Sequence, residues 1–298
     1  MRTRLPCDAP VVSNHRGLDR VWEEAVQIQV LGPLSADVNG VSIVPTAGKP
    51  RQILALLSFY PGRVVPVSTL MEEIWGSNMP QSAMTTLQTY ILQLRRRLGT
   101  AMGPGAPGSA KDVLATRHGG YLLQVPPECV DVHRYEELVT AGQASFEAGD
   151  DERAAAQLRD ALGMWEGTAL VDVSTGPILE IEVMRLEESR LVTVERRIDV
   201  DLRLGRHSEV IAELADLIAR HPQHEGLHSQ AMVALYRSGR QATALDVYRK
   251  LRLRLVEELG VEPSPQLQRL HQAMLAVDPA LDVICGPRRG STFNLYAA

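Results

Sequence analysis

The sequence is poor in cysteine and has no long uninterrupted apolar run. Its three cysteines, Cys7, Cys129 and Cys285, lie far apart and form no CxxC pair. This argues against a disulfide framework and against a zinc site, and it is typical of a protein from a reducing compartment. No stretch of about 18 uncharged apolar residues occurs, and residues 1–25 mix arginines with acidic residues instead of forming an apolar signal segment. We therefore expect a cytoplasmic protein without a membrane partner.

Motifs of catalysis and cofactor binding are also missing. The sequence has no GxxxxGK[ST] loop for nucleotide phosphates and no GxSxG motif around a nucleophilic serine. The spacing of His221, His224 and His228 would suit three metal-binding imidazoles on one helical face. However, Pro222 interrupts the first turn, and no carboxylate pair or cysteine completes the shell. We expect neither an enzyme nor a bound metal or other cofactor.

The charge is divided unevenly between the two halves of the chain. Residues 1–130 contain 12 Lys and Arg against 9 Asp and Glu, a net charge of +3. Residues 131–298 contain 19 against 27, a net charge of −8. The two halves are therefore expected to bind different partners, because a negative surface repels nucleic acid and a positive one attracts it.

The first third of the chain changes its hydrophobic period several times. Residues 28–44 alternate apolar and polar positions around Asn39-Gly40, a dipeptide that favours the tight turn of a β-hairpin. Apolar residues then recur at helical spacing in "KPRQILALLSFYPG" (residues 49–62) and in "VSTLMEEIWG" (residues 67–76). We predict two short strands followed by two helices, with Ser68 capping the second helix.

A third helix and a second hairpin follow. The helix is predicted to begin at Gln81 or Ser82 and to end at Leu98, because Gly99 is a helix-stop signal. Residues 100–111 are rich in Gly, Pro and Ala and predict a linker, and residues 112–125 predict a hairpin hinged at Gly119-Gly120. Strands, three helices and a hairpin form the layout of a winged helix-turn-helix.

The third helix separates its apolar and polar side chains onto opposite faces. At 100° per residue, the apolar residues from Leu87 to Leu98 form one stripe, and Thr, Gln and Arg lie opposite. No acidic residue occurs between Gln81 and Asp112. Hydroxyl, amide and guanidinium groups are the ones that read base edges in the major groove. We predict base contacts from this helix by Thr85, Thr86, Thr89, Gln93 and Arg96.

Basic residues around this helix are predicted to hold the DNA backbone. Arg95 and Arg97 flank the apolar stripe and are placed at phosphates on either side of the groove. Lys49 and Arg51 lie at the start of the first helix, and the hairpin tip offers Arg117 to the adjacent minor groove. The predicted set of contacts also includes Ser82 and His118.

The three consecutive arginines Arg95, Arg96 and Arg97 also have a purely structural explanation, which has to be weighed against DNA binding. Cations in the last turn of a helix complement its dipole, which contributes roughly 0.3–1 kcal/mol. Cations on three separate elements favour DNA binding over this explanation, because a groove-docked module needs them there. Trp75 precedes Gly76 in an apolar stretch and is predicted to be a core anchor, not a base-stacking group.

The second half is predicted to be helical throughout. Gly149, Gly205 and Gly239 each open a similar pattern, with small or apolar residues at the fifth, ninth and twelfth positions after the glycine. The 34 residues from Gly205 to Gly239 are spaced like a tetratricopeptide unit, whereas the longer interval before Gly205 predicts an inserted helix over residues 176–205. A generic helical bundle with accidental spacing is the alternative. Stacked helix pairs present surfaces to other proteins.

Together these segments resemble a known family. "GKPRQILALLSFYPGRVVPVSTLMEEIWG", "SAMTTLQTYILQLRRRLG" and "TRHGGYLLQV" look like the winged helix of the Streptomyces antibiotic regulatory protein family. "VDVHRYEELVTAG" looks like the start of its bacterial transcriptional activation domain. The resemblance implies a pathway-specific activator of antibiotic biosynthesis genes. It also implies binding to direct repeats in double-stranded DNA near a promoter, as a side-by-side homodimer that contacts RNA polymerase holoenzyme.

The expected fold is mainly α, with an α+β N-terminal winged helix-turn-helix followed by a tetratricopeptide-like all-helical domain. The predicted division is an extension at 1–26, the DNA-binding domain at 27–127, the activation domain at 128–276 and a tail at 277–298. The competing hypothesis is a helical-repeat scaffold or ligand sensor that does not bind DNA specifically.

Overall fold

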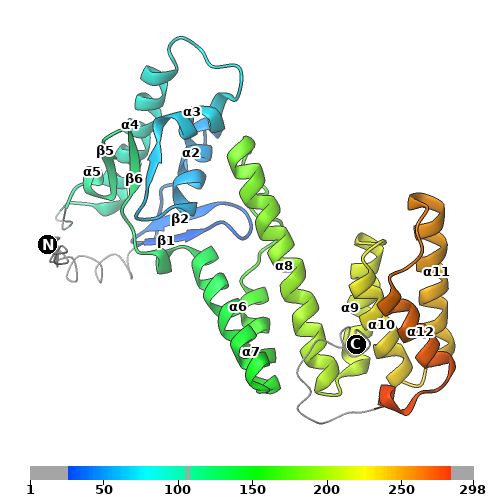
Figure 1. Ribbon diagram of the computed structural model, residues 1–298. Coiled ribbons are helices and arrows are strands. Elements are labelled where there is room, and N and C mark those ends of the chain that lie inside the picture. The colour runs from blue at the N-terminus through cyan, green and yellow to red at the C-terminus, as the bar shows by residue number, and fades with distance from the viewer. Residues whose placement is uncertain (1–25, 105, 107, 283–298) are drawn as a thin grey trace, which may run out of the picture. The chain divides into compact units, whose positions relative to one another are not determined.

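The computed structural model describes residues 26–104, 106 and 108–282 (Figure 1), and its contacts divide the chain into two compact units. The first unit contains the described residues up to 134 together with 166–184, and the second contains 135–165 together with those from 185 onwards. The predicted division at residue 127 is linear, whereas here a segment from the second half of the chain belongs to the first unit. The predicted extension, except Val26, and the tail after Asp282 lie outside the described residues.

The first unit begins with a small antiparallel sheet in the order β1-β2-β3. Its strands are β1 (Val26–Gln29), β2 (Ser35–Val38) and β3 (Val41–Ser42). Asn39 and Gly40 form the turn between β2 and β3 with φ values of 53° and 75°. This confirms the predicted hairpin, because only a few residue types accept two successive positive φ angles.

Three helices follow the sheet, as predicted. They are α2 (Gly48–Phe59), α3 (Val67–Trp75) and α4 (Ala83–Met102), and β4 (Val64–Pro66) lies between the first two. The residues of α2 from Gln52 to Phe59 are all buried. The prediction for Ser68 was wrong: it lies inside α3, and Pro66 occupies the N-cap position.

Helix α4 is longer than predicted. It passes Gly99 and ends at Met102, and its C-cap residue is Gly103, whose φ is 73°. Gly within a helix costs about 1 kcal/mol relative to Ala, but Ala101 and Met102 are buried beyond it. Burial of these two side chains offsets that cost, so the prediction that the helix ends at Leu98 was wrong.

The wing is a hairpin that pairs with β4. It consists of β5 (Leu114–Arg117) and β6 (Gly120–Leu123) in a sheet of order β4-β6-β5, and the short helix α5 (Ala110–Val113) precedes it. The turn is formed by His118 and Gly119, and Gly120 already belongs to β6, so the hinge lies one residue earlier than predicted. A Cβ atom at Gly120 would lie 2.3 Å from the carbonyl oxygen of Val65. The close pairing of β4 and β6 therefore requires glycine there.

Segment 166–184 is bonded to the β1–β2 loop of the first unit. The amide of Glu166 donates to the carbonyl oxygen of Leu31 at 2.9 Å, and the amide of Leu170 donates to that of Val30 at 3.1 Å. The carboxylate of Asp172 accepts the amide of Leu34 at 2.7 Å. Through these bonds, the backbone of the segment is held by residues of the first unit.

Glu73 of α3 holds the other end of this segment. The side chain is 2% exposed and accepts hydrogen bonds from the amides of Gly176 at 2.7 Å, Ile178 at 2.9 Å and Leu179 at 3.0 Å. These amides belong to the start of α8 (Pro177–Arg203), where a helix has no internal acceptors for its first N–H groups. A carboxylate is a favourable partner there because of the helix dipole.

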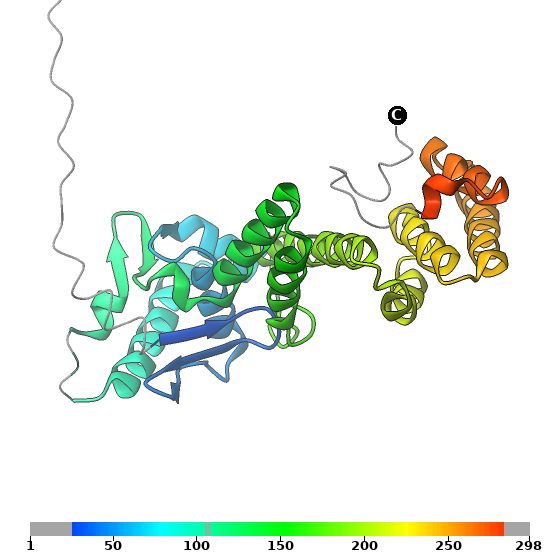
Figure 2. The ribbon, with the colours of Figure 1, turned by 90° about the horizontal axis from the view of Figure 1, so that it is seen from below.

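The second unit is built from helices. They are α6 (Asp131–Ala148), α7 (Asp151–Gly163), the later part of α8, α9 (His207–Arg220), α10 (Glu225–Arg237), α11 (Gln241–Leu259) and α12 (Pro265–Leu275). The short helices η1 (Pro127–Cys129) and η2 (Pro279–Asp282) flank the series. Figure 2 shows α9 to α12 in yellow to red, packed side by side.

The glycine pattern of the second half is confirmed as a set of helix starts. Gly149, Gly205 and Gly239 have φ values of 81°, 81° and 73°. Helices α7, α9 and α11 each begin two residues later. Eight of the nine residues at the predicted spacing are buried, and Leu217 is half-buried. The predicted helix at 176–205 is present as α8, and its C-terminal half packs into the same apolar core as α9 and α10.

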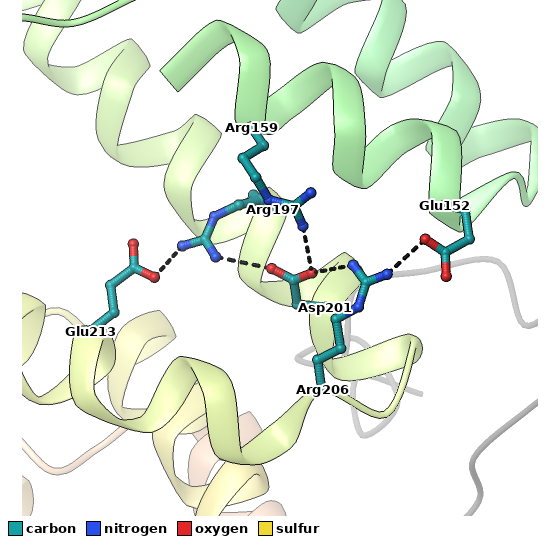
Figure 3. Close-up of polar contacts among 6 residues, drawn as sticks. All are labelled: Glu152, Arg159, Arg197, Asp201, Arg206 and Glu213. Atoms are coloured by element: carbon teal, nitrogen blue, oxygen red, sulfur yellow. Dashed lines mark hydrogen bonds and ion pairs between the residues drawn. The ribbon is translucent and has the colours of Figure 1, made fainter. Parts of the chain in front are cut away.

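A buried charge network joins three helices of the second unit (Figure 3). Asp201 of α8 is 4% exposed and accepts from Arg197 at 2.9 Å, from Arg206 at 3.0 Å and from Arg159 of α7 at 3.4 Å. Arg197 also pairs with Glu213 of α9. Each buried charge has an opposite partner, which is the condition under which buried ion pairs persist.

Candidate nucleic-acid interface

Helix α4 presents a mostly polar face to solvent. Its apolar stripe is buried as predicted: Leu87, Ile91, Leu94 and Leu98 are each at most 2% exposed. The opposite face is exposed, whereas Thr86 at its edge is half-buried. The exposed residues from the predicted base-reading set are Thr85, Thr89, Gln93 and Arg96.

Two further exposed residues of this helix were missed in the sequence. Gln88 is exposed, and Leu92 is 48% exposed. On a helical wheel at about 100° per residue, Leu92 falls about 140° from Leu87, next to the predicted polar arc, whereas Gln88 falls about 100° from Leu87, on the flank near Arg95. The wheel could therefore have found Leu92, but it does not place Gln88 on the opposite face. An exposed leucine among amides and hydroxyls suits the methyl group of thymine.

The hydroxyl groups of α4 are partly used inside the helix. Thr89 Oγ1 donates to the carbonyl oxygen of Thr85 at 3.0 Å, and Thr100 Oγ1 donates to that of Arg96 at 3.0 Å. Thr89 therefore offers a methyl group and acceptor lone pairs outward, but no free hydroxyl hydrogen. The donors on the exposed side of α4 are the hydroxyl of Thr85, the amides of Gln88 and Gln93 and the guanidinium of Arg96.

Arg95 has a different position from the one predicted. Its Nε donates to the carbonyl oxygen of Leu114 at 2.9 Å, and its Nη2 donates to Thr116 Oγ1 at 2.8 Å. Both acceptors belong to β5 of the wing. The guanidinium group thus fastens the wing to α4. Arg95 is therefore not the free cation that was predicted to be available to a phosphate.

Arg96 and Arg97 differ from Arg95 in this respect. Neither side chain forms a hydrogen bond or ion pair with any residue in the described part of the chain. Arg96 is exposed, and Arg97 is half-buried. An arginine without a protein acceptor keeps its full set of N–H donors for an anionic ligand.

The cations at the start of α2 also have partners. Lys49 is exposed and lies over the ring of half-buried Trp75, with its Nζ 5.1 Å from the ring centroid. Arg51 Nη1 donates to Asp172 Oδ2 at 2.9 Å, and its Nε donates to the carbonyl oxygen of Pro45 at 3.2 Å. Arg51 is therefore neutralised by segment 166–184, contrary to the role of phosphate anchor expected from the sequence.

The remaining predicted residues lie at the two ends of this surface. Arg117 and His118 are exposed at the wing tip, beside the His118-Gly119 turn. Ser82 is the exposed N-cap residue of α4, and its hydroxyl makes no capping hydrogen bond within the described structure. The N-terminus of a helix attracts anions, so Ser82 lies where a phosphate would be favoured.

This arrangement defines a class: a winged-helix transcription regulator with an appended helical domain. Residues 43–123 match the family described as "Transcriptional regulatory protein, C terminal", and residues 130–275 match the "Bacterial transcriptional activator domain". The chain is 53% identical over 257 residues to regulatory protein DnrI of Streptomyces peucetius, covering 86% of this chain and 94% of the relative. It is 38% identical over 258 residues to transcriptional regulator RedD of Streptomyces coelicolor, covering 87% and 73%.

A solved structure shows the same fold. Mycobacterium tuberculosis EmbR, in complex with a low-affinity phosphopeptide, superposes with a TM-score of 0.79 at 32% identity, covering 86% of this chain and 68% of EmbR. The chain belongs to the Streptomyces antibiotic regulatory protein family. It is a DNA-binding transcription activator and not an enzyme. Within the described residues, no helix is long and apolar enough to span a membrane.

Proposed function

We propose that the protein activates the genes of one antibiotic biosynthesis pathway by binding direct repeats near their promoters as a side-by-side pair. The observation that carries the proposal is the acid-free exposed face of α4 beside the tip of the wing. A helix of this composition fits the major groove, and the wing tip then reaches the neighbouring minor groove.

Base reading is assigned to the exposed centre of α4. Arg96 and Gln93 provide donors suited to guanine and adenine edges, respectively. Thr85, Thr89 and the newly recognised Gln88 complete the set of polar side chains there. Thr86 is placed at the edge of the contact because it is half-buried.

Phosphate contacts are assigned to the cations that the protein leaves available. Arg97 borders the base-reading face, Lys49 is exposed above Trp75, and Arg117 lies at the wing tip. Ser82 and His118 add hydroxyl and imidazole donors at the two ends. Arg51 and Arg95 are assigned supporting roles instead, because Asp172 and β5 already bind their guanidinium groups.

The helical unit is assigned to protein contacts in the cytoplasm. The net charge of −8 over residues 131–298 disfavours contact with DNA by this half. We assign it to RNA polymerase holoenzyme and to the second protomer of the pair. Both assignments follow the family resemblance.

Footprinting tests the proposal. The full chain is added to DNA from the promoters around its own gene, with excess competitor DNA. The expected result is protection of repeats whose centres lie on one side of the duplex, about one helical turn of 10–10.5 bp apart or a multiple of it. The same chain carrying Arg96→Ala should lose this protection, whereas Arg220→Ala, at an exposed position of α9, should keep it. Absence of any complex in the presence of competitor DNA would favour the scaffold or ligand-sensor hypothesis.

A further inference from the structure

Helices α9, α10 and α11 of the helical unit line a long groove with a volume of about 890 Å³. The lining side chains of α10 are buried, whereas those of α9 and α11 are mostly exposed or half-buried. Helix α10 therefore forms the floor, and α9 and α11 form the two walls (Figure 2). We call this feature the α9–α11 groove. The contacts proposed for DNA use none of its residues.

The wall formed by α9 is apolar and is built partly from small side chains. Ile211, Ala215, Ile218 and Ala219 recur at helical spacing and therefore lie on one face. The two alanines are exposed, and the two isoleucines are half-buried. Among the described residues that line the groove, none from α9 is charged. Another helix can approach this wall closely, because the distance between packed helices depends on the size of the side chains at the contact.

The floor combines apolar side chains with a hydrogen-bond acceptor. Ala231 and Leu235 are buried, and His228 beside them is 3% exposed. The Nδ1 atom of His228 lies 3.1 Å from the carbonyl oxygen of His224. A carbonyl oxygen can only accept, so Nδ1 carries the hydrogen and the Nε2 atom of the neutral ring is an acceptor. Burial lowers the pKa of His228, which favours this neutral form.

Positive charge gathers where α11 begins. Arg240 is the exposed N-cap residue of α11, and its guanidinium group has no acceptor within the described structure. The first turn of α11 contains no acidic residue, so the partial positive charge of the helix N-terminus adds to that of Arg240. Lys250 lies further along this wall and pairs with Asp246 at 2.8 Å in an ion pair that is largely exposed. Such pairs are weak, so Lys250 remains available to another carboxylate.

Negative charge gathers at the opposite end of the groove. Glu257 and Glu258 line it near the C-terminus of α11. Gln223, which follows α9, donates to Glu258 at 2.8 Å, so the C-terminal ends of α9 and α11 lie together. Helix C-termini carry a partial negative charge, which adds to that of the carboxylates. At about 1.5 Å per helical residue, Glu257 lies about 25 Å along the wall from Arg240.

These features match a helix better than a small molecule or an extended peptide. A small metabolite does not reach both charged ends, whereas a helix of about 17 residues does. The walls are helices and offer no strand edge for an extended peptide to join. We propose that the α9–α11 groove binds an amphipathic helix of a partner protein. Its apolar face lies in the groove, with a carboxylate at Arg240 and a basic residue at Glu257.

The charge of the groove differs from that of the unit around it. Residues 131–298 have a net charge of −8, as calculated above. The charged side chains that line the groove are nevertheless three basic ones, Arg240, Lys250 and Arg254, and the two glutamates at its end. A carboxylate is therefore favoured at the basic end in spite of the acidic unit. The inference rests on the protein-binding role proposed for the helical unit, but not on which bases α4 reads.

A displayed peptide library tests the proposal, with the full chain as bait. Each peptide is an alanine-based helix of about 18 residues with leucine, isoleucine or methionine along one face. The positions at both ends vary among Glu, Lys and Gln. Ala215→Trp fills the groove in a blocked bait, and Ala212→Trp is the matched control. Both alanines are exposed on α9, and of the two only Ala215 lines the groove.

Peptides with Glu at one end and Lys at the other should be enriched on the unchanged chain and on Ala212→Trp, and Ala215→Trp should not retain them. Enrichment of Lys at both ends, as expected for attraction to the acidic unit as a whole, would overturn the proposal. Equal enrichment on Ala215→Trp would do the same. So would a lack of enrichment on a bait that still protects its DNA repeats, whereas loss of that protection would count against the proposed function.

A synthetic copy of an enriched peptide gives an independent measurement by fluorescence anisotropy. Arg240→Glu should lower its affinity about fivefold, as for the loss of an exposed ion pair. Exchanging the Glu of the peptide for Lys should restore binding to this variant. Arg249→Glu is the matched control, because Arg249 is exposed on the same helix but is not among the residues that line the groove. Equal losses in the two variants would contradict a specific contact with Arg240.

Sedimentation measurements distinguish a partner helix from a second copy of the chain. Self-association that is lost in Ala215→Trp but kept in Ala212→Trp would overturn the proposal, in favour of a second copy as the occupant. Equal sedimentation of the two variants and the unchanged chain is the expected result. Circular dichroism of each variant verifies that the helical fold is retained.

Discussion

Arg95 and Thr116 join α4 to the wing through a hydrogen bond of 2.8 Å between Nη2 and Oγ1. The same guanidinium donates to the carbonyl oxygen of Leu114. The wing tip with Arg117 lies one residue beyond Thr116. The position of the wing tip relative to α4, and with it the proposed minor-groove contact, is therefore set by a side chain that the sequence suggested for a phosphate.

The variant Arg95→Ala is expected to weaken DNA binding by loosening the wing. It should also lower the free energy of unfolding of the first unit by about 1–2 kcal/mol, since two hydrogen bonds to a charged group are lost. Anisotropy titrations over a series of salt concentrations give the slope of affinity against salt. An unchanged slope is expected for Arg95→Ala, and a slope reduced by about one unit would restore its assignment to a phosphate.

Arg96 and Arg97 should behave differently from each other. We expect Arg96→Ala to cost about 1–3 kcal/mol of binding free energy on the correct repeat and far less on unrelated DNA, because it removes a base contact. Arg97→Ala should weaken all sequences alike and reduce the salt slope by about one unit, because it removes a phosphate contact. Titration of both variants on matched and scrambled duplexes measures the difference. Equal losses on every duplex would remove the base-reading assignment of Arg96.

Glu73 is expected to stabilise the packing of α3 against the start of α8. Replacement by alanine leaves three amides at the start of a helix without their acceptor, and we expect a loss of about 2–4 kcal/mol of unfolding free energy. Hydrogen exchange at Gly176, Ile178 and Leu179 should accelerate in Glu73→Ala. The neighbouring exposed residue provides the control: Glu72→Ala should change neither measurement. Unchanged exchange in Glu73→Ala would refute the capping role.

Asp131 is expected to make stability depend on pH. Burial raises the pKa of this carboxyl from 3.8 to about 6, although the amides of Leu31 and Val30 oppose the shift. The folded state therefore holds the proton more strongly than the unfolded state. The contribution is fully present below pH 4, is lost as the pH rises through 6, and amounts to about 2–3 kcal/mol.

The titration of Asp131 can be measured directly. The carboxyl carbon shift in nuclear magnetic resonance spectra should move with a midpoint near the value of about 6. Urea unfolding of the first unit should become less dependent on pH between 4 and 6 in Asp131→Asn. A midpoint close to the ordinary value would show that the two amides outweigh burial at this site.

Local patterns in the sequence predicted local structure well. Asn39-Gly40 marked the hairpin, and the glycines before α7, α9 and α11 marked helix starts, because each conformation depends on residues next to it. The end of α4 was predicted wrongly. The burial of Ala101 and Met102 overrides the stop signal at Gly99, and burial cannot be read from the neighbouring residues alone.

The roles of several charged residues depended on partners far away in the sequence. Arg51 meets Asp172 across 121 positions, and Glu73 meets Gly176 across 103. A helical wheel shows which way a side chain points, but it does not show which distant acceptor lies there. The exposed face of α4 could therefore be predicted, whereas the cations that remain available around it could not.

The position of segment 166–184 in the first unit limits how hybrid proteins can be made from two members of this family. The protein's first unit takes its residues from two separate stretches of the chain. A single crossover placed between these stretches would therefore give a hybrid in which Asp172 and Gly176 come from one parent and Arg51 and Glu73 from the other. Exchanging operator preference between such activators requires either two crossovers that carry the segment along or parents that share both pairs of contacts.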